Sequence, residues 1–310
     1  MKILVVGAGG VGGYYGAVLS KSHHEVLILA RGTHLAAIRD KGLSLRSENS
    51  GNFTVYPEVS DTLNPDWKAD LVLFCVKSYH NPDAMIAMGP AIADSTNILT
   101  LQNGIGSGND LSNNFGGDKV ILGATYIDGW VDSPGIVAEQ GEPFKTVFGE
   151  EANHETARIK TIEEAFLNAG IDAEISENIN DSLWIKLLYI CGLSGMSCIT
   201  QGSIKHVLED TDSLKMLRSI LLEVKDVGLA RGINFDQGIV DQTIDNMYQN
   251  RETLTSSMYL DMIAGKPLEI SVLNGAVVNE GRNYGIKTPL NDFINTCLSI
   301  VDSRARGLTS

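Results

Sequence analysis

The sequence predicts an α/β protein in which an N-terminal Rossmann-type parallel-sheet domain is followed by an all-α C-terminal domain. Strand and helix signals alternate up to residue 176, and such alternation indicates βαβ units and a parallel sheet. From residue 178 onward the signals are helical. The length of 310 residues also fits two domains. We therefore expect one domain at residues 1–176 and a second at residues 177–310.

Four apolar runs are the expected strands of the parallel sheet. They are continuously apolar rather than alternating, as in strands that are buried on both faces. The runs are Lys2–Val6, Glu25–Ala30, Asp70–Val76 and Asn97–Leu101. Helices are expected between these strands, at residues 11–21 and 34–41, and then at residues 154–168 after a β-rich section over residues 120–149.

Six helices are expected in the second domain. They span residues 181–200, 213–231, 237–250, 254–264, 270–284 and 289–304.

The charge and composition of the chain argue against several classes of partner. The formal net charge is −14, and an acidic protein repels nucleic-acid phosphates. The four cysteines have neither CxxC nor zinc-ligand spacing, and the six histidines are scattered, so we expect no metal site. We recognise no signal peptide, and no membrane span outside the motif-bearing segments. We therefore expect a cytoplasmic protein without a membrane partner.

A glycine-rich segment fits the dinucleotide-binding pattern G-x-G-x-x-G. It follows the strand Lys2–Val6 and opens a helix, which is the context that the motif requires. The first glycine permits a tight turn, the second lets backbone amides approach a pyrophosphate, and the third allows close helix–strand packing. The expected cofactor-binding residues are Gly7, Ala8, Gly9, Gly10, Val11 and Gly12.

The end of the second strand indicates which dinucleotide binds. A site for NAD usually has Asp or Glu there, which binds the 2′-hydroxyl of the ribose. Here Ala30-Arg31-Gly32 ends the strand, and Arg31 can form charge-assisted hydrogen bonds with a 2′-phosphate. A solvated surface arginine is the alternative. Together with the glycine-rich motif, Arg31 favours NADP(H).

One lysine stands in an otherwise uncharged stretch. Between Ser182 and Ile204 the only charged residue is Lys186, and its neighbours are mainly apolar. Desolvation would lower the pKa of this lysine toward the range useful for proton transfer, and reduction of a carbonyl group by hydride requires a proton donor. The alternative is a lysine whose stem packs on apolar surface while its ammonium group reaches water.

Two further polar residues are candidates for the site. Asn103 follows the strand Asn97–Leu101, at the carboxyl end where open α/β sheets bind ligands, although a simple Asn-Gly turn is the alternative. Glu269 precedes an expected helix. An acid there either interacts favourably with the helix dipole or serves as a partner for Lys186 or a ribose hydroxyl.

Motifs along essentially the whole chain resemble those of the ketopantoate reductase family. They are GAGGVG at residues 7–12, Arg31-Gly32, Val76-Lys77, LQNG at residues 101–104, SLWIKLL at residues 182–188, Ser256-Ser257-Met258, Asp261, Gly265-Lys266-Pro267, Glu269-Ile270 and Leu273-Asn274-Gly275. The resemblance implies reduction of ketopantoate (2-dehydropantoate) to pantoate with NADPH, on the route to pantothenate.

The resemblance also implies a role for each candidate residue. Lys186 would be the general acid that protonates the carbonyl oxygen, and Glu269 would orient the lysine or bind cofactor. Asn103 would lie near the nicotinamide and the substrate, and Ser257 would contact the substrate carboxylate. The dinucleotide would be held by the glycine-rich segment, Arg31 and Lys77.

The chain departs from the family pattern four and eight residues after the lysine. The family commonly has asparagines there that help to bind the substrate, whereas this chain has Ile190 and Ser194. Positions i, i+4 and i+8 lie close to one face of a helix, so we expect both side chains at the substrate. The apolar Ile190 favours a 2-keto acid with a bulkier apolar side chain.

Three functions stay open at the level of the sequence. The first is ketopantoate reductase, and the second is a related D-2-hydroxyacid dehydrogenase that acts on a bulkier apolar 2-keto acid. The third is a non-catalytic NADP-binding sensor, against which the presence of Lys186 argues. The sequence does not reveal the oligomeric state, and a homodimer is one alternative.

Overall fold

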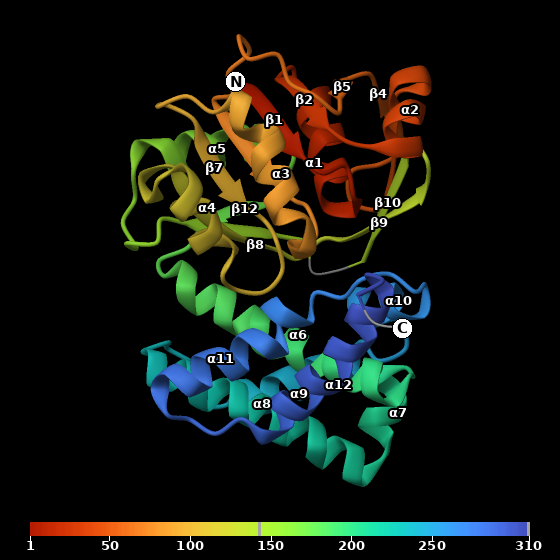
Figure 1. Ribbon diagram of the computed structural model, residues 1–310, viewed down its shortest axis with the longest axis vertical. Coiled ribbons are helices and arrows are strands. Elements are labelled where there is room, and N and C mark those ends of the chain that lie inside the picture. The colour runs from red at the N-terminus through yellow and green to blue at the C-terminus, as the bar shows by residue number, and fades with distance from the viewer. Residues whose placement is uncertain (142–143, 309–310) are drawn as a thin grey trace. The chain divides into compact units, whose positions relative to one another are not determined.

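A computed structural model describes residues 1–141 and 144–308 of the chain. The chain divides into two units: unit 1 comprises Met1–Gln102 and Ser107–Ile179, and unit 2 comprises Asn103–Gly106 and Asn180–Ser310. Unit 1 is an α/β unit and unit 2 is helical, so the predicted fold class is confirmed (Figure 1).

An eight-stranded sheet is the core of unit 1. Its order is β12-β11-β8-β7-β6-β1-β2-β5; β8 and β11 pair antiparallel, and the other described neighbours pair parallel. The strands are β1 (Lys2–Val6), β2 (Glu25–Leu29), β5 (Glu58–Ser60), β6 (Leu71–Phe74), β7 (Asn97–Thr100), β8 (Val120–Thr125), β11 (Thr146–Gly149) and β12 (Ala173–Ile175). The order reverses beside β1, which lies between β2 and β6. Open α/β sheets bind ligands at such a switch point.

The four predicted strands are confirmed as β1, β2, β6 and β7. Their continuous apolar runs are buried on both faces, as expected. Ile3 and Leu73 belong to the core cluster on one face of the sheet, and Leu4 and Val72 belong to the cluster on the other face.

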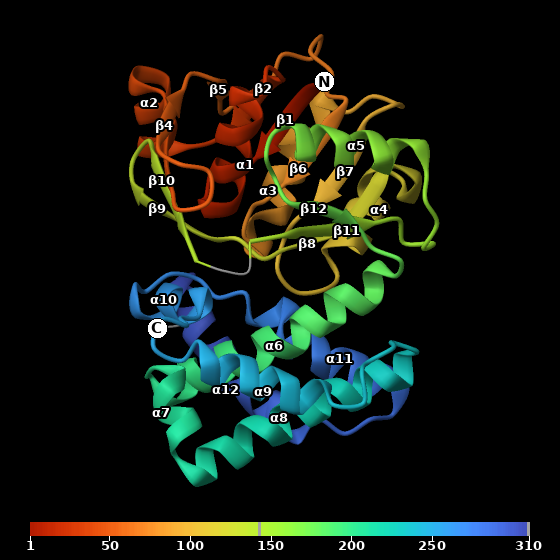
Figure 2. The same ribbon diagram turned by 180° about the vertical axis from the view of Figure 1, so that it is seen from behind.

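Helices cover both faces of this sheet. Residues of α1 (Gly10–Lys21) and α5 (Ala157–Asn168) share a core cluster on one face, and residues of α3 (Asn81–Met88) and α4 (Ser107–Phe115) share the cluster on the other face. Figure 1 and Figure 2 show these two faces from opposite sides. The start of α5 lies three residues after the predicted one because Thr156 is its N-cap, and the side chain of Thr156 accepts a hydrogen bond from the amide of Ile159.

A second, four-stranded sheet packs against α1. Its order is β4-β3-β10-β9, with β3 at Leu43–Ser47, β4 at Phe53–Val55, β9 at Asp128–Ser133 and β10 at Ile136–Gln140. With β8 and β11 of the first sheet, β9 and β10 confirm the β-rich section predicted at residues 120–149 over its described residues, outside which 142 and 143 lie. The sequence predicts no element over residues 43–60, where β3, β4 and β5 are only three to five residues long. The helix α2 (Gly32–Lys41) connects β2 to this sheet.

Unit 2 contains the six predicted helices, with one correction. The helices are α6 (Ile179–Thr200), α7 (Ile204–Glu209), α8 (Thr211–Arg231), α9 (Ile239–Gln249), α10 (Ser257–Ile263), α11 (Asn274–Tyr284) and α12 (Pro289–Ala305). The short α7 is additional to the prediction. The prediction of one continuous helix over residues 270–284 is wrong. A 3₁₀ turn at Ile270–Val272 is separated from α11 by Leu273, whose φ and ψ are both −107°.

The central helix of unit 2 is α6. Among the described residues, α6 is the one helix long and apolar enough to cross a membrane by length and composition. Of its most apolar 18-residue window, 67% is buried inside the protein, which favours a core helix over a membrane span. The same helix carries the candidate proton donor Lys186.

Candidate active site

The glycine-rich turn of unit 1 has the backbone geometry that a diphosphate requires. Gly7, which directly follows β1, has a φ of +96°, and α1 begins at Gly10. A Cβ atom at Gly12 would lie 1.9 Å from the carbonyl oxygen of Gly7, so this position requires glycine. A Cβ atom at Gly9 would meet nothing within 4 Å, which leaves open space before the amino end of α1. The residues present therefore fit a dinucleotide, whose phosphates bind to helix amides and the helix dipole.

Arg31 and Lys77 follow the two strands that flank β1. Arg31 is exposed, comes directly after the buried Ala30, and is the N-cap residue of α2. Lys77 is half-buried and lies three residues after the end of β6. Because β6, β1 and β2 are neighbouring parallel strands, both cations lie at the same edge of the sheet as the glycine-rich turn.

In unit 2, Lys186 forms a hydrogen bond with Asn103. The lysine Nζ donates to the Asn103 Oδ1 at 2.8 Å, between residues that are 83 positions apart in the chain. The lysine comes from the middle of α6, and the asparagine comes from the four-residue segment that follows β7 and Gln102. This bond orients the Asn103 amide, with its oxygen toward the lysine and its NH₂ group away from it.

The surroundings of Lys186 shift its proton affinity. Burial lowers the pKa of the Lys186 ammonium from 10.5 to about 8, and the negative charge of Glu269 opposes this shift. Glu269 is itself only 5% exposed. A lysine with this pKa is still mostly protonated at neutral pH, and it releases its proton more readily than an exposed lysine.

The short segment at Asn103–Gly106 is held against the 3₁₀ turn that follows Glu269. The amide of Ile105 donates to the carbonyl oxygen of Val272 at 3.2 Å. A Cβ atom at Gly104, whose φ is +83°, would lie 2.2 Å from the same oxygen. The Asn-Gly pair in this chain is therefore more than a surface turn, because its glycine allows the close approach that fixes Asn103.

The three other predicted substrate residues have different surroundings. Ile190 lies one helical turn after Lys186 on α6 and is half-buried. Ser194 is only 3% exposed, and its hydroxyl accepts a hydrogen bond from Ser256 at 2.9 Å. Ser257 is exposed and is the first residue of α10. Their contacts with a substrate stay predictions.

A buried polar network in unit 2 is not predicted from the sequence. The side-chain amide of Asn274 donates to the carbonyl oxygen of Cys191 on α6 at 3.3 Å and to the Asn291 Oδ1 at 2.9 Å. Asn291 donates in turn to the Glu223 carboxylate at 2.8 Å. The network thus connects α6, α8, α11 and α12. The Leu-Asn-Gly motif is a signal for Asn274, but the sequence does not reveal its partners.

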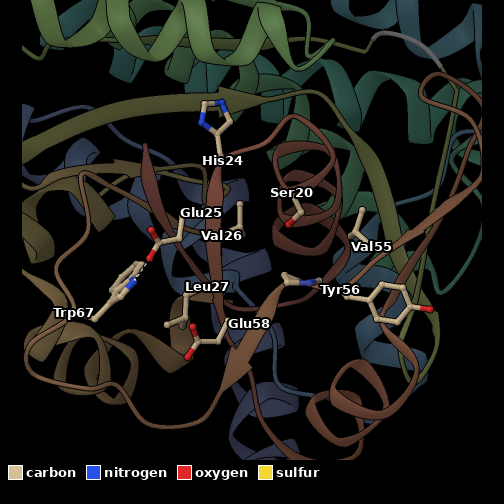
Figure 3. Close-up of a pocket in the computed structure, with 10 residues that line it drawn as sticks. Ser20, His24, Glu25, Val26, Leu27, Val55, Tyr56, Glu58 and Trp67 are labelled. Atoms are coloured by element: carbon tan, nitrogen blue, oxygen red, sulfur yellow. Dashed lines mark hydrogen bonds between the residues drawn. The ribbon is translucent and has the colours of Figure 1, made fainter.

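A pocket of about 310 Å³ in unit 1 lies apart from the glycine-rich turn (Figure 3). Its lining includes the amino-terminal half of β2 and Trp67, whose indole nitrogen donates to the Glu25 carboxylate at 2.7 Å. The glycine-rich turn lies at the carboxyl ends of the same parallel strands, so the pocket is at the opposite edge of the sheet. Over residues 1–141 and 144–308, no group of three or more His, Cys, Asp or Glu residues could hold a metal ion.

Comparisons with known proteins agree with this fold along nearly the whole chain. The family model described as "Ketopantoate reductase PanE/ApbA" matches residues 3–153, and the model described as "Ketopantoate reductase PanE/ApbA C terminal" matches residues 178–302. The 2-dehydropantoate 2-reductase of Pyrococcus abyssi is 30% identical to this chain, over 94% of each protein.

Solved structures show the same relationship. A PanE/ApbA family ketopantoate reductase from Ralstonia eutropha has a TM-score of 0.89 and 31% identity, with 99% of this chain and all of that one covered. A D-mandelate dehydrogenase, solved with NADH and anilino(oxo)acetate, has a TM-score of 0.90 at 23% identity and covers 99% of both chains, which shows a shared fold alone.

Together, the fold, the glycine-rich turn and the Lys186 site define a two-unit protein with a Rossmann-type dinucleotide fold and a helical unit that carries a half-buried lysine. The chain belongs to the ketopantoate reductase family.

Proposed function

We propose that this protein is an NADPH-dependent oxidoreductase that reduces 2-dehydropantoate (ketopantoate) to pantoate, a step toward pantothenate. Its relatives with this name, the Rossmann-type unit and the lysine site support the proposal. The observation that carries it is the half-buried Lys186, whose Nζ bonds Asn103 and whose pKa burial lowers to about 8.

The cofactor would be held by the glycine-rich turn, Arg31 and Lys77. When bound, NADPH supplies the hydride for the carbonyl carbon of the 2-keto acid. Arg31 would form charge-assisted hydrogen bonds with the 2′-phosphate, and the α1 amides would bind the diphosphate. The open space at Gly9 and the absence of an acid directly after β2 both fit this assignment.

The chain's own residues supply the proton and orient the substrate. As the carbonyl carbon is reduced, negative charge develops on its oxygen, and the Lys186 ammonium donates a proton there to give the hydroxyl group. Solvent then returns a proton to the lysine. Asn103 holds the lysine Nζ at 2.8 Å, Glu269 keeps enough negative charge nearby to favour the ammonium form, and Ser257 would bind the substrate carboxylate.

Steady-state oxidation of NADPH tests the proposal. The wild-type protein is expected to oxidise NADPH with 2-dehydropantoate, and the product should be identified as pantoate by mass. Binding of NADPH is measured separately by calorimetry. NADPH binding without turnover of any 2-keto acid in a panel would overturn the proposal and point to the non-catalytic sensor.

The second candidate is a D-2-hydroxyacid dehydrogenase for a bulkier apolar 2-keto acid. The observation in its favour is Ile190, which lies half-buried one turn beyond Lys186 where the family commonly has asparagine. The same panel should therefore include 2-ketoisovalerate and phenylglyoxylate. Since an apolar contact discriminates weakly, a preference for 2-dehydropantoate above about 100-fold would exclude this candidate.

We also infer a cytoplasmic location and an absence of nucleic-acid and membrane partners. All four cysteines are free, which suits a reducing compartment, and the net charge of −14 disfavours binding to nucleic acid. The homodimer stays a prediction, which sedimentation velocity would test.

A further inference from the structure

The short helix α10 begins with two serines in opposite environments. Ser256 is 2% exposed and is the N-cap residue, and its Oγ accepts a hydrogen bond from the Tyr259 amide at 3.2 Å. Ser257, the next residue, is exposed. The buried serine therefore fixes the start of α10, while its neighbour is accessible to a ligand.

The buried serine is bonded to α6. The Ser256 Oγ donates to the Ser194 Oγ at 2.9 Å, and both hydroxyls are buried. A buried hydroxyl without a partner is costly, so each of these two groups stabilises the position of the other. Ser194 lies eight residues after Lys186 on the same helix, or about 12 Å along the axis at 1.5 Å per residue.

One further hydrogen bond and a buried methionine hold the rest of α10 in place. The hydroxyl of Tyr259 donates to the carbonyl oxygen of Gln201, which directly follows α6, at 3.0 Å. Met258 is 2% exposed and belongs to the same core cluster as Met196 of α6. The hydrogen bonds of Ser256 and Tyr259 therefore attach α10 to the carboxyl-terminal end of α6, and Ser194 is the α6 side chain that bonds the residue next to Ser257.

We propose that Ser194 is a positioning residue that fixes Ser257 relative to Lys186, rather than a direct contact of the substrate. The proposal rests on the proposed function, in which Ser257 binds the substrate carboxylate and Lys186 protonates its carbonyl oxygen. Both groups are then attached to one helix: the proton donor directly, and the carboxylate-binding hydroxyl through the Ser194–Ser256 hydrogen bond. A 2-keto acid has its carboxylate next to the reacting carbonyl, so a fixed separation of the two groups selects this class of substrate.

A double-mutant cycle between Ser194 and Ser257 tests the proposal. Ser194→Ala is expected to raise the KM for 2-dehydropantoate about 5- to 10-fold, the usual effect of one lost hydrogen bond, while kcat changes less than about twofold. In a Ser257→Ala background the same change should have little further effect, because Ser194 acts through Ser257. The Kd for NADPH should stay the same in all variants.

The matched control is Ser197→Ala. Ser197 lies on the same helix and is 2% exposed, so this change also removes a buried serine hydroxyl from α6. Thermal unfolding of each variant monitors folding. Equal KM values for Ser194→Ala and Ser197→Ala would mean that Ser194 has only a structural role, and they would overturn the proposal. Independent, additive effects of Ser194→Ala and Ser257→Ala would overturn it in favour of direct contact with the substrate.

Failure of the proposed function has a different signature. If the proposed function is wrong, the wild-type protein itself will bind NADPH without turnover, and the positioning role of Ser194 will then be wrong as well. A wild-type protein that turns over 2-dehydropantoate, together with an unchanged KM in Ser257→Ala, would overturn the positioning role alone.

Discussion

The glycine-rich turn of unit 1 is made almost wholly of backbone, whereas the Lys186 site of unit 2 is made of side chains from three separate segments. In the turn, the first glycine of the motif, Gly7, gives the required φ, and the last, Gly12, allows the close approach. In the lysine site, residues 83 positions apart meet in one hydrogen bond. Backbone geometry of the first kind is set by local sequence, but a side-chain cluster depends on how distant segments pack.

We expect the two regions to have separate roles. The turn and Arg31 are expected to set the affinity for the dinucleotide, while Lys186 and its neighbours set the rate of proton transfer and the choice of substrate. Substitutions in one region should then leave the function of the other unchanged.

Replacement of Lys186 should give the largest effect. We expect Lys186→Ala to lower kcat by roughly 10²–10⁴-fold, the usual contribution of a positioned general acid, with an unchanged Kd for NADPH. Folding should survive because alanine is a good helix former and the change removes a half-buried charge. Steady-state kinetics and thermal unfolding measure both effects, with the exposed Lys215→Ala as the matched control. Near-normal turnover would mean that another group supplies the proton.

The pH dependence of the wild-type reduction should report the same lysine. Because the pKa of Lys186 is lowered to about 8, the acid form is present below that pH and is lost as the pH rises through it. We expect kcat/KM for reduction to be level below pH 8 and to fall about tenfold per pH unit above it. A profile that stays level well above pH 8 would contradict the assignment of Lys186 as the acid.

Replacement of Arg31 should have an intermediate effect on the other region. Arg31→Ala is expected to weaken NADPH binding by about 1.5 kcal/mol, or roughly tenfold, because an exposed arginine gives the low end of the range for a charge-assisted hydrogen bond. Binding of NADH, which has no 2′-phosphate, should be unchanged. Calorimetric titration with both cofactors measures this, beside Arg39→Ala within α2, the helix that Arg31 caps. If Arg31→Ala keeps the wild-type affinity for NADPH, Arg31 does not recognise the phosphate.

Replacement of Ile190 should have the smallest effect, confined to the choice of substrate. We expect Ile190→Asn to raise the ratio of kcat/KM for 2-dehydropantoate over 2-ketoisovalerate by about 3- to 10-fold, because an amide can bond the substrate hydroxyl that 2-ketoisovalerate lacks. Ile199→Asn makes the same change at an exposed position near the end of α6. An unchanged ratio would place Ile190 outside the substrate site.

The parts of the fold predicted from the sequence are those with a local cause. The buried strands have continuous apolar runs, and α1 begins within a glycine motif, so both are found without knowledge of the packing. The break at Leu273 could not be predicted in this way. The Val272 carbonyl oxygen accepts the amide of Ile105, a residue from a remote segment, and nothing in the local sequence signals this contact.

The candidate site shows the same limit. Lys186 stands out because it is the one charge in an apolar stretch, and Asn103 follows a predicted strand. Helical spacing predicts that Ser194 lies on the same face of the helix as Lys186. Spacing does not reveal that the Ser194 hydroxyl already accepts a hydrogen bond from Ser256. Likewise, the partners of Asn274 come from α6 and α12, and only the packing of the helices identifies them.

The proton affinity of Lys186 also bears on the direction of the reaction. A group that gives a proton to the carbonyl oxygen during reduction must take it back from the hydroxyl group when a 2-hydroxy acid is oxidised. Its ammonium form serves the first direction and its neutral amine the second, and the two forms are equal at about pH 8. Near neutral pH the Lys186 side chain is therefore mostly the ammonium acid that reduction requires. In alkaline solution the same side chain becomes the neutral amine that can act as the base in oxidation.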